Sequence, residues 1–382
     1  ALFSKLVLNF YVMNIKALTL GLLGISIIAC AQNDSTIDTL EEDYSHEVII
    51  ADIDIPWGLD FFEDGSFLAT SKEGQIYYHK NGTTTKVADV PNVYNRGQGG
   101  LLDVKIHPDY PQKPWIYFTH ASTLGDEDGG HTALVKANFI DGQLSNMETL
   151  YKASPNTTKG VHFGSRLEFD NDGYLYMSVG ERGERELNPQ DISRDGGKIY
   201  RFNDDGSIPG DNPFYTDENA IKAIYSYGHR NPQGMEMHPE SGKIWVHEHG
   251  PRGGDEINII KKGANYGWPV ISYGINYNGT ELTDQTSQLG MEQPFYYWVP
   301  SIAPSGMTFV TSDKYPKLKG NILAGSLKFQ YLEHLVINED GVQKREKLLN
   351  QVGRVRTVKQ GTDGFIYVGI EGVGIVKMLP KS

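Results

Sequence analysis

The sequence predicts an all-β fold, specifically a six-bladed β-propeller. A hydrophobic pattern with the 3.6-residue period of a helix is hard to find after residue 46. Short apolar strands instead follow turn signals such as Asp-Gly and Ser-Gly six times, at 63–82, 107–122, 169–208, 238–250, 315–341 and 361–379. Each unit is a small antiparallel sheet that cannot bury both faces alone. Closing about six of them around an axis removes their exposed edges.

One domain accounts for most of the chain. The length of 382 residues would suggest two or three domains, but closed all-β folds often exceed about 200 residues as one unit. We expect a propeller domain over 47–382, with a strand at about 47–52 joining the last blade to close the ring. The net charge of −13 argues against a nucleic-acid partner, because phosphates attract a basic surface.

The N-terminal region is expected to contain a targeting signal. In "MNIKALTLGLLGISIIAC" an apolar run over 17–29 follows Lys16 and ends at Cys30, the single cysteine. The run is too short to span a bilayer, and "IIAC" is similar to a bacterial lipobox. The alternative is a plain signal peptide with an incidental cysteine.

These features predict a lipoprotein of the cell envelope, periplasmic or at the surface, that contacts the membrane only through a lipid anchor at Cys30. We expect a signal peptide over 1–30, of which 1–12 are an upstream extension, and a polar, flexible tether over 31–46.

Polar residues on the loops at one end of a propeller are the candidates for function. His162 in "VHFGSRLEF" has the side chain best suited to act as a base near neutral pH. Arg230 and Asn231 in "GHRNPQG" supply a fixed positive charge and an amide, and the arginine would keep a nearby imidazole neutral. The structural alternatives are a turn histidine bonded to backbone and an arginine paired with a surface carboxylate.

A basic group lies near the end of the chain. Arg354 and Arg356 in "GRVR" are two residues apart, so on a strand they share a face and repel unless an anion lies between them. With Lys328 they suit a polycarboxylate or a phosphate. The alternative is a solvated basic edge, which is less expected in so acidic a chain.

The segment 247–269 is acidic, rich in glycine and loop-like. Asp255, Glu256 and the carbonyls of Gly250 and Pro251 are hard oxygen ligands of the kind that calcium prefers. A second hypothesis for the segment is a metal pair formed by the histidines of "HEH", His247 and His249.

Aromatic residues in and after this segment, Tyr266, Trp268 and Tyr277, are expected to form a flat wall for a planar ligand. The chain has no "GxGxxG", no Walker A loop, no "GxSxG" and no "HExxH". An enzyme that uses nicotinamide or ATP is therefore not expected.

Together these motifs give the chain a family resemblance. It resembles the soluble quinoprotein sugar dehydrogenases of the glucose/sorbosone dehydrogenase family, over residues 48–380, and is closest in length to the bacterial soluble aldose sugar dehydrogenases. The resemblance rests on nine motifs in family order: "DIPWGLDFFEDGSFLAT", "GQGGLLDVKIHPDY", "VHFGSRLEFDNDGYLYMSVGERG", "GGKIYRFNDDGSIPGDNPF", "GHRNPQGM", "HGPRGGDEIN", "GANYGWP", "GSLK" and "GRVR".

The resemblance implies a six-bladed propeller that holds pyrroloquinoline quinone (PQQ) and calcium and oxidises aldoses at C1. By this resemblance, His162 is the general base and Arg230 stabilises charge on the quinone oxygen. The cofactor-binding residues are Gln98, Arg230, Asn231, Tyr277, Lys328, Arg354 and Arg356. The carbonyls of Gly250 and Pro251 bind the calcium next to PQQ, and Glu256 and Tyr266 match positions that hold a second, structural calcium.

Departures from the family pattern concern the sugar. Val161 stands where the glucose-specific relatives have an aspartate, and Glu184 and Glu186 stand where those relatives contact sugar through amides. The long loops of the dimeric relatives are missing, so we expect a monomer with a broad or different aldose preference. The electron acceptor is not predicted.

Two other functions remain open at this stage. One is a calcium-dependent hydrolase of sugar lactones, which would not need the basic group of Lys328, Arg354 and Arg356. The other is a propeller that binds a glycan or a protein without chemistry, which would lack the base or the cofactor ligands.

Overall fold

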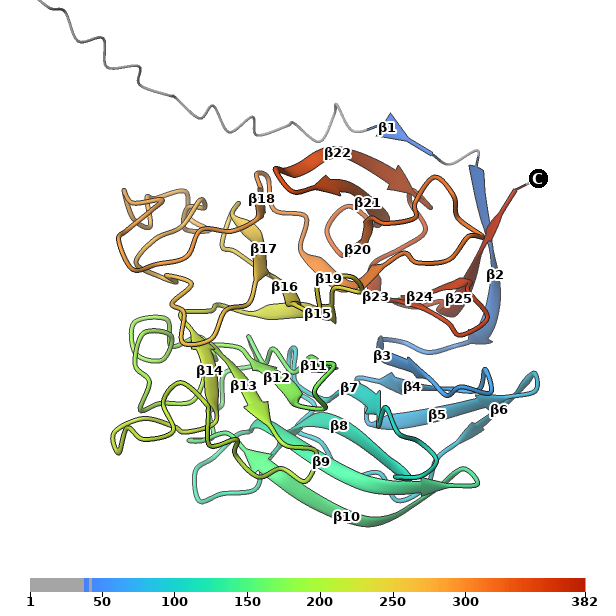
Figure 1. Cartoon of the computed structure of the whole chain (residues 1–382), viewed down its shortest axis with the longest axis horizontal. Coiled ribbons are helices and arrows are strands. Elements are labelled where there is room, and N and C mark those ends of the chain that lie inside the picture. Colours follow the sequence, from blue (N-terminus) through green and yellow to red (C-terminus); the bar gives the residue numbers. More distant parts are fainter. Residues whose placement is uncertain (1–37, 41–42, 382) are drawn as a thin grey trace, which may run out of the picture. The chain divides into compact units, whose positions relative to one another are not determined.

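Six antiparallel sheets arranged in a ring make up the part of the chain that the structure, a computed structural model, describes: residues 38–40 and 43–381 (Figure 1). This confirms the six-bladed β-propeller. The expected signal peptide with Cys30, and most of the expected tether, lie outside the described residues. Within those residues, no helix is long and apolar enough to cross a membrane.

Each blade runs outward from an innermost strand, and the innermost strands contact one another around the axis. Blade 1 comprises β3 (Pro56–Phe61), β4 (Phe67–Ser71), β5 (Gln75–Lys80) and β6 (Thr83–Lys86). Blade 2 comprises β7 (Leu101–Ile106), β8 (Trp115–Ser122), β9 (His131–Ile140) and β10 (Gln143–Lys152). Blade 3 comprises β11 (Leu167–Phe169), β12 (Leu175–Val179), β13 (Lys198–Phe202) and β14 (Ile224–Tyr227).

The second half of the ring repeats this plan. Blade 4 comprises β15 (Pro232–Met237), β16 (Ile244–Glu248), β17 (Asp255–Ile259) and β18 (Tyr296–Trp298). Blade 5 comprises β19 (Pro304–Phe309), β20 (Ile322–Ser326), β21 (Tyr331–Asn338) and β22 (Gly341–Leu348). Blade 6 comprises β23 (Val355–Gln360), β24 (Ile366–Ile370), β25 (Gly374–Pro380) and β2 (Tyr44–Ala51).

The ring is closed by strands from opposite ends of the propeller. β2 pairs antiparallel with β25, with Val48 opposite Val376, and forms the outer edge of blade 6. The expectation that a strand near 47–52 completes the last blade is therefore confirmed. The short β1 (Asp38–Thr39) pairs in parallel with β22.

The repeated Asp-Gly signal is the turn between the first and second strands of a blade. In three blades an aspartate Oδ1 accepts a hydrogen bond from a backbone N–H two residues on: Asp64 from Ser66 at 3.0 Å, Asp170 from Asp172 at 3.0 Å and Asp363 from Phe365 at 3.0 Å. The glycines of these turns have positive φ, which other residues rarely adopt.

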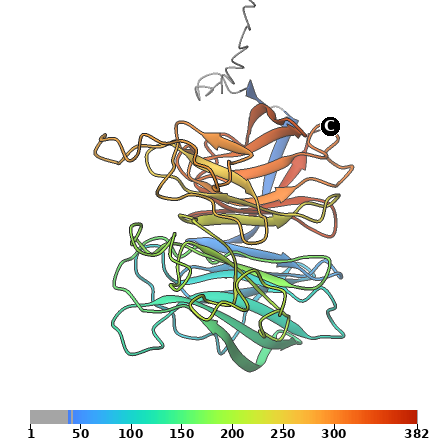
Figure 2. The same ribbon diagram turned by 60° about the vertical axis from the view of Figure 1, so that its left-hand side comes forward.

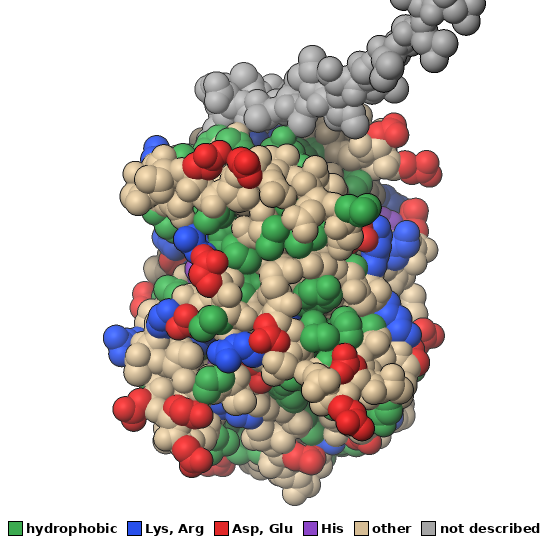
Figure 3. All heavy atoms as spheres, turned by 90° about the vertical axis from the view of Figure 1, so that its left-hand side faces the viewer, with side chains coloured by type: hydrophobic (Ala, Val, Ile, Leu, Met, Phe, Trp, Pro, Cys, Tyr) green, Lys and Arg blue, Asp and Glu red, His purple; other side chains and the backbone are tan. Residues whose placement is uncertain are grey.

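Apolar side chains fill the spaces between neighbouring blades. One core cluster joins Leu68 of blade 1 to Val104 and Phe118 of blade 2, and another joins Tyr117 of blade 2 to Met177 of blade 3. The longest loop between strands in the described chain is 260–295 of blade 4, which connects β17 and β18 and is drawn in yellow to orange in Figures 1 and 2. On the side shown in Figure 3, acidic and basic side chains are interspersed among apolar ones.

Candidate active site

His162 lies in the loop that leads into β11, the innermost strand of blade 3. Its backbone N–H donates to Oε1 of Gln98 at 2.8 Å, and its Nδ1 contacts a carboxylate oxygen of Glu181. His162 and Ser165 have φ of 54° and 82°, in the left-handed region that non-glycine residues seldom occupy. Such strain persists where surrounding contacts hold it, so the orientation of the imidazole is fixed by its neighbours.

The imidazole is neutral near pH 7. Burial lowers the pKa of His162 most, the hydrogen bond to Glu181 raises it, and the charge of Arg230 lowers it further. From the sequence we expected Arg230 to help keep this imidazole neutral, and it does lower the pKa, but burial is the larger cause. Glu181 also connects the base to the next blade, because its backbone N–H donates to the carbonyl of Arg230 at 2.9 Å.

Arg230 and Asn231 form a corner beside this base. The Nη1 of Arg230 donates to the carbonyl of His249 at 3.0 Å, and the guanidinium lies 5.2 Å from the ring centre of Trp268. Oδ1 of Asn231 accepts from the backbone N–H of Gly164 at 3.1 Å.

Two donors at this corner have no partner. Nε of Arg230 and Nδ2 of Asn231 are buried, and neither makes a hydrogen bond within the described residues. A buried donor without a partner is costly, so donors of this kind indicate a ligand.

A third residue holds the two arginines of "GRVR". Glu371 accepts from Nε of Arg354 at 2.6 Å and from Nε of Arg356 at 3.0 Å, through different carboxylate oxygens. The anion expected between the two guanidiniums is therefore supplied by the chain itself. Lys328 differs, because within the described residues its ammonium has no carboxylate partner and lies 4.7 Å from the ring centre of Phe329.

Two adjoining cavities bring five of the seven predicted cofactor residues together, whereas Arg230 lines a smaller cavity and Asn231 lines none of the three. A cleft of about 970 Å³ is lined by Gly250, Pro251, Tyr277, Lys328 and Arg354 among others. A cavity of about 240 Å³ is lined by Gln98, Arg354, Arg356 and Glu371 among others, and Arg354 belongs to both. Residues from several blades thus converge on one end of the ring.

The carbonyls proposed to bind calcium belong to a loop that Asp255 orders. Its Oδ1 accepts from the backbone N–H of Gly250 at 2.8 Å and from the hydroxyl of Ser301 at 2.9 Å. Burial raises the pKa of Asp255 to about 6. Gly250 and Pro251 line the large cleft, where neutral carbonyl oxygens suit a hard cation.

Glu256 lies in a separate, much smaller cavity of about 10 Å³ that Arg230, Glu248 and Tyr266 also line. Burial, and then the charge of Glu248, raises the pKa of Glu256 to about 8. Asn258 bridges the two carboxylates with hydrogen bonds of 3.1 Å to each. Two buried carboxylates this close favour a cation or a proton between them.

Comparison with known proteins gives the family. The sequence profile described as Glucose / Sorbosone dehydrogenase matches residues 53–376. The chain belongs to this family. It is 40% identical over 330 residues to the aldose sugar dehydrogenase YliI of Escherichia coli, which covers 84% of this chain and 88% of the relative. It is 31% identical over 260 residues to quinoprotein glucose dehydrogenase B of Acinetobacter calcoaceticus, which covers 60% and 53%.

Solved structures in the glucose/sorbosone dehydrogenase family have the same fold. The crystal structure of the soluble aldose sugar dehydrogenase of Escherichia coli in the apo-form has a TM-score of 0.85 at 38% identity, and the match covers 88% of this chain and all of that one, 100%. The PQQ-bound aldose sugar dehydrogenase of Streptomyces coelicolor has a TM-score of 0.72 at 26% identity, covering 88% and 98%.

One sequence-based expectation about this family member is wrong. Tyr266 and Trp268 are only 4% and 7% exposed, so they form no wall, and Tyr277, at 72%, alone of the three lines the cleft. The second hypothesis for this segment, a metal pair of His247 and His249, gains no support: Nε2 of each contacts a backbone carbonyl of blade 5, at 3.0 and 2.8 Å.

The side chain of Tyr266 takes part in the core, and its place in a second calcium site stays a prediction. The hydroxyl donates to the carbonyl of Ile259 at 2.7 Å, and the ring stacks on His229 at 4.5 Å between centres. No group of three or more metal-ligating side chains occurs in the described part of the chain.

Sequence reasoning missed Glu181, Glu371 and the role of Asp255 in holding the carbonyl loop. For Glu181 a signal existed, since "GERG" directly follows β12 and lies at the same end of the blade as His162. Among the residues that depart from the family pattern, Glu184 forms an ion pair of 2.6 Å with Lys159 on the loop beside the base.

Proposed function

We propose that the protein oxidises aldose sugars at C1 to the aldonolactone, with PQQ as the hydride acceptor and calcium beside it. The observation that carries this proposal is that His162, held by Glu181, bonds through its backbone N–H to Gln98, which lines the same cavity as Arg354 and Arg356. Lys328 lines the adjoining cleft, which shares Arg354. Membership of the glucose/sorbosone dehydrogenase family supports it, as does the similarity to a PQQ-bound aldose sugar dehydrogenase.

The residues of the cleft fit the cofactor. Lys328 and the two arginines, of which one positive charge is offset by Glu371, match the negative charge of the PQQ carboxylates. The buried Nδ2 of Asn231, without a partner among the described residues, is a further candidate donor. The proposed ligands of calcium are the carbonyls of Gly250 and Pro251. When bound, PQQ supplies a two-electron acceptor that no side chain provides.

His162 removes the proton from the anomeric hydroxyl. Its Nδ1 is held by Glu181, which leaves Nε2 to accept that proton while the hydrogen on C1 departs with its electron pair. The carbon–oxygen bond becomes the carbonyl of the lactone. The Glu181 carboxylate stabilises the imidazolium formed in this step, as a carboxylate does for a general-base histidine elsewhere.

Arg230 stabilises negative charge that builds on oxygen at the same corner. Its guanidinium is fixed by the carbonyl of His249 and still has a free buried donor, so it needs little reorganisation during the reaction. A donor that is positioned before the reaction acts mainly in the transition state and therefore raises kcat more than it lowers KM.

The test is reduction of an electron-accepting dye by purified protein with PQQ, Ca²⁺ and a panel of aldoses. We expect reduction that depends on the sugar and on PQQ. His162→Ala and Arg230→Ala should fold and lose about 100-fold or more of kcat, whereas His46→Ala, which removes an exposed histidine of β2, should keep full activity. Hydrolysis of sugar lactones without PQQ, or full activity in His162→Ala, would exclude the proposed reaction.

We further propose that the protein is a monomeric lipoprotein of the cell envelope, anchored at Cys30 after removal of a signal peptide. The lipobox-like "IIAC" supports the anchor. Labelling with radioactive palmitate should be lost in Cys30→Ala, and light scattering of the purified protein should give the mass of one chain. Unchanged labelling, or a dimer mass, contradicts the respective statement.

A further inference from the structure

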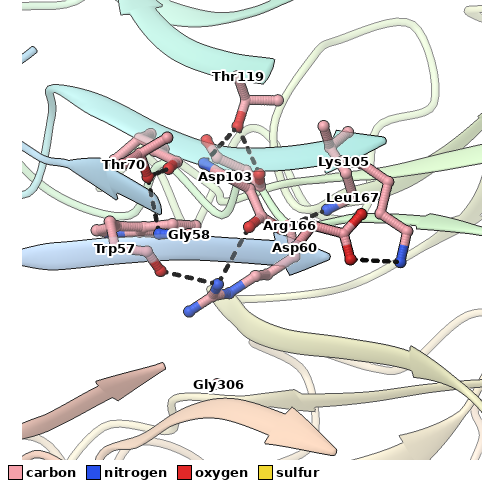
Figure 4. A network of polar contacts seen from close by, with 12 residues as sticks. Trp57, Gly58, Asp60, Thr70, Asp103, Lys105, Thr119, Arg166, Leu167 and Gly306 are labelled. Carbon is pink, nitrogen blue, oxygen red and sulfur yellow. Dashed lines mark hydrogen bonds and ion pairs between the residues drawn. The ribbon is translucent and has the colours of Figure 1, made fainter. Parts of the chain in front are cut away.

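Arg166 connects the innermost strands of the ring directly beneath the candidate site. Its guanidinium, only 4% exposed at the start of blade 3, donates to the carbonyls of Gln233 at 2.7 Å, Trp57 at 3.1 Å and Arg356 at 3.1 Å. It also contacts Oδ1 of Asp103 at 3.4 Å and stacks over the ring of Trp57 at 4.0 Å. One side chain thus contacts blades 1, 2, 4 and 6. Figure 4 shows its contacts with Trp57 of blade 1 and Asp103 of blade 2.

The contacts of Arg166 reach both halves of the site. On one side the carbonyl of Arg356 accepts from Arg166 and also from the hydroxyl of Ser305 at 2.8 Å, so the backbone that carries this cation is held from two blades. On the other side Arg166 follows His162 by four residues.

The segment between the base and Arg166 has little freedom of its own. Ser165 donates from its backbone N–H to Ser178 at 2.7 Å and accepts from the hydroxyl of Thr119 at 2.7 Å. Gly164 and Ser165 have φ of 61° and 82°. If the guanidinium moves, we expect His162 to move with it, because these bonds leave the loop between them little room to change its conformation.

Arg166 and Asp103 form one layer of charged side chains at the axis. A second layer, here called the lower layer, lies further along the same strands and makes none of the bonds that Arg166 makes. It consists of Asp60, Lys105, Glu168, Glu236 and Lys359, with the Lys105–Glu168 pair at 2.8 Å and the Lys359–Glu236 pair at 3.1 Å. A cavity of about 30 Å³ lies between the two layers. Both layers join blades at the axis, but among their side chains, in the described part of the protein, Arg166 is the one that bonds to a site residue, Arg356.

We propose that Arg166 is a positioning residue that sets the distance between the base segment 162–165 and the cation Arg356. This inference rests on the proposed function, because the distance matters only when a ligand lies between the two. The guanidinium is suited to this role, since its planar donors bond three carbonyls of different blades at once, which the single ammonium of a lysine cannot reproduce.

The experiment compares two buried substitutions at the axis in the full-length protein, at a temperature where both are folded. Arg166→Lys keeps the charge but loses the planar geometry. Glu236→Gln removes a charge from the lower layer and serves as the matched control. We expect PQQ to bind about tenfold more weakly to Arg166→Lys, as measured by quenching of protein fluorescence, and within about twofold of the wild type to Glu236→Gln. Equal affinity for Arg166→Lys and the wild type, or equal losses in both variants, would overturn the inference.

A readout without PQQ separates this inference from the proposed function. In the protein without ligand, backbone amides of 161–166 and 353–358 should exchange hydrogen faster in Arg166→Lys than in Glu236→Gln or the wild type. If the wild type binds no PQQ, the proposed function fails, and unchanged exchange in Arg166→Lys then overturns the positioning role as well.

A second variant covers the case in which Arg166→Lys does not fold. Asp103→Asn preserves side-chain size and removes the charge that faces the guanidinium. It should also weaken PQQ binding relative to Glu236→Gln, and equal affinity in these two variants overturns the inference.

Discussion

The carboxylate of Glu181 contacts Nδ1 of His162, so the two side chains form a dyad whose other imidazole nitrogen remains free. Glu181 is itself almost fully buried, at 1% exposure, and its backbone is bonded to Arg230. The carboxylate therefore orients the base, and the backbone of Glu181 links it to Arg230.

Replacing Glu181 should alter both the rate and its pH dependence. Below the pKa of His162, which burial holds under its usual 6.5, the imidazole is protonated and the activity falls. The carboxylate raises this pKa, so Glu181→Gln should move the acidic limb of kcat/KM to lower pH while lowering the plateau by about 100-fold. Measurement of kcat/KM from pH 4 to 8 tests this.

Glu184→Gln is the matched control for that profile, because the carboxylate of Glu184 pairs with Lys159, whereas that of Glu181 contacts the imidazole of His162. Its acidic limb should coincide with that of the wild type. An acidic limb that stays in place in Glu181→Gln would contradict the role assigned to the dyad.

Lys328→Ala should weaken cofactor binding without loss of stability. Its ammonium lines the cleft and has no carboxylate partner in the described chain, so removing it breaks no ion pair. We expect about a tenfold weaker affinity for PQQ, with a shallower salt dependence and an unchanged thermal midpoint. Lys314→Ala is the control, since that ammonium also lies over a phenylalanine ring, at 4.4 Å, outside the cleft. Equal affinities in the two variants would remove Lys328 from the site.

Calcium should stabilise the protein against unfolding, and Glu256 should contribute to this stabilisation. A ligand that binds only the folded state at a hundredfold excess over Kd adds about 2.7 kcal/mol to the free energy of unfolding. Glu256→Gln removes one of the two facing carboxylates, so calcium should raise its thermal midpoint less than that of the wild type. Glu240→Gln, on an exposed turn of the same blade, should respond like the wild type. An identical calcium response in Glu256→Gln would disprove a cation site there.

His120 should contribute to loss of stability in acid. Burial lowers the pKa of this imidazole, whose buried Nδ1 has no partner among the described residues, to about 4, whereas in the unfolded chain it is about 6.5. The unfolded state therefore takes up a proton first, and stability is lost as the pH falls from 6.5 to 4, by roughly 3 kcal/mol in total. His120→Leu should lose less stability over this range in urea unfolding. Parallel losses in variant and wild type would show that other groups dominate.

Local sequence patterns were enough to predict most of the fold. The Asp-Gly turns predicted the junction of the first two strands of a blade because the aspartate and the glycine act within a few residues of each other. The closing strand could also be predicted, since a ring of such sheets needs one more strand at its edge. The site residues came from the family motifs rather than from periodicity.

What could not be predicted depends on contacts between distant segments. Glu371 meets Arg354 only because β23 and β24 pair in one register, with Val355 opposite Ile370. Tyr266 and Trp268 looked like ligand-facing aromatics by composition, but the path of the loop turns them into the core. Burial, which composition does not report, also decides the charge state of His162.

The pairing of β2 with β25 has a consequence for the order in which the enzyme is made on the ribosome. The blade that bears Arg354 and Arg356 takes its edge strand, β2, from the start of the propeller and its other three strands from residues 355–380. During synthesis β2 therefore has to wait for β25 before this blade can be completed. The blade that supplies these two cations thus depends on a pairing between segments made far apart in time.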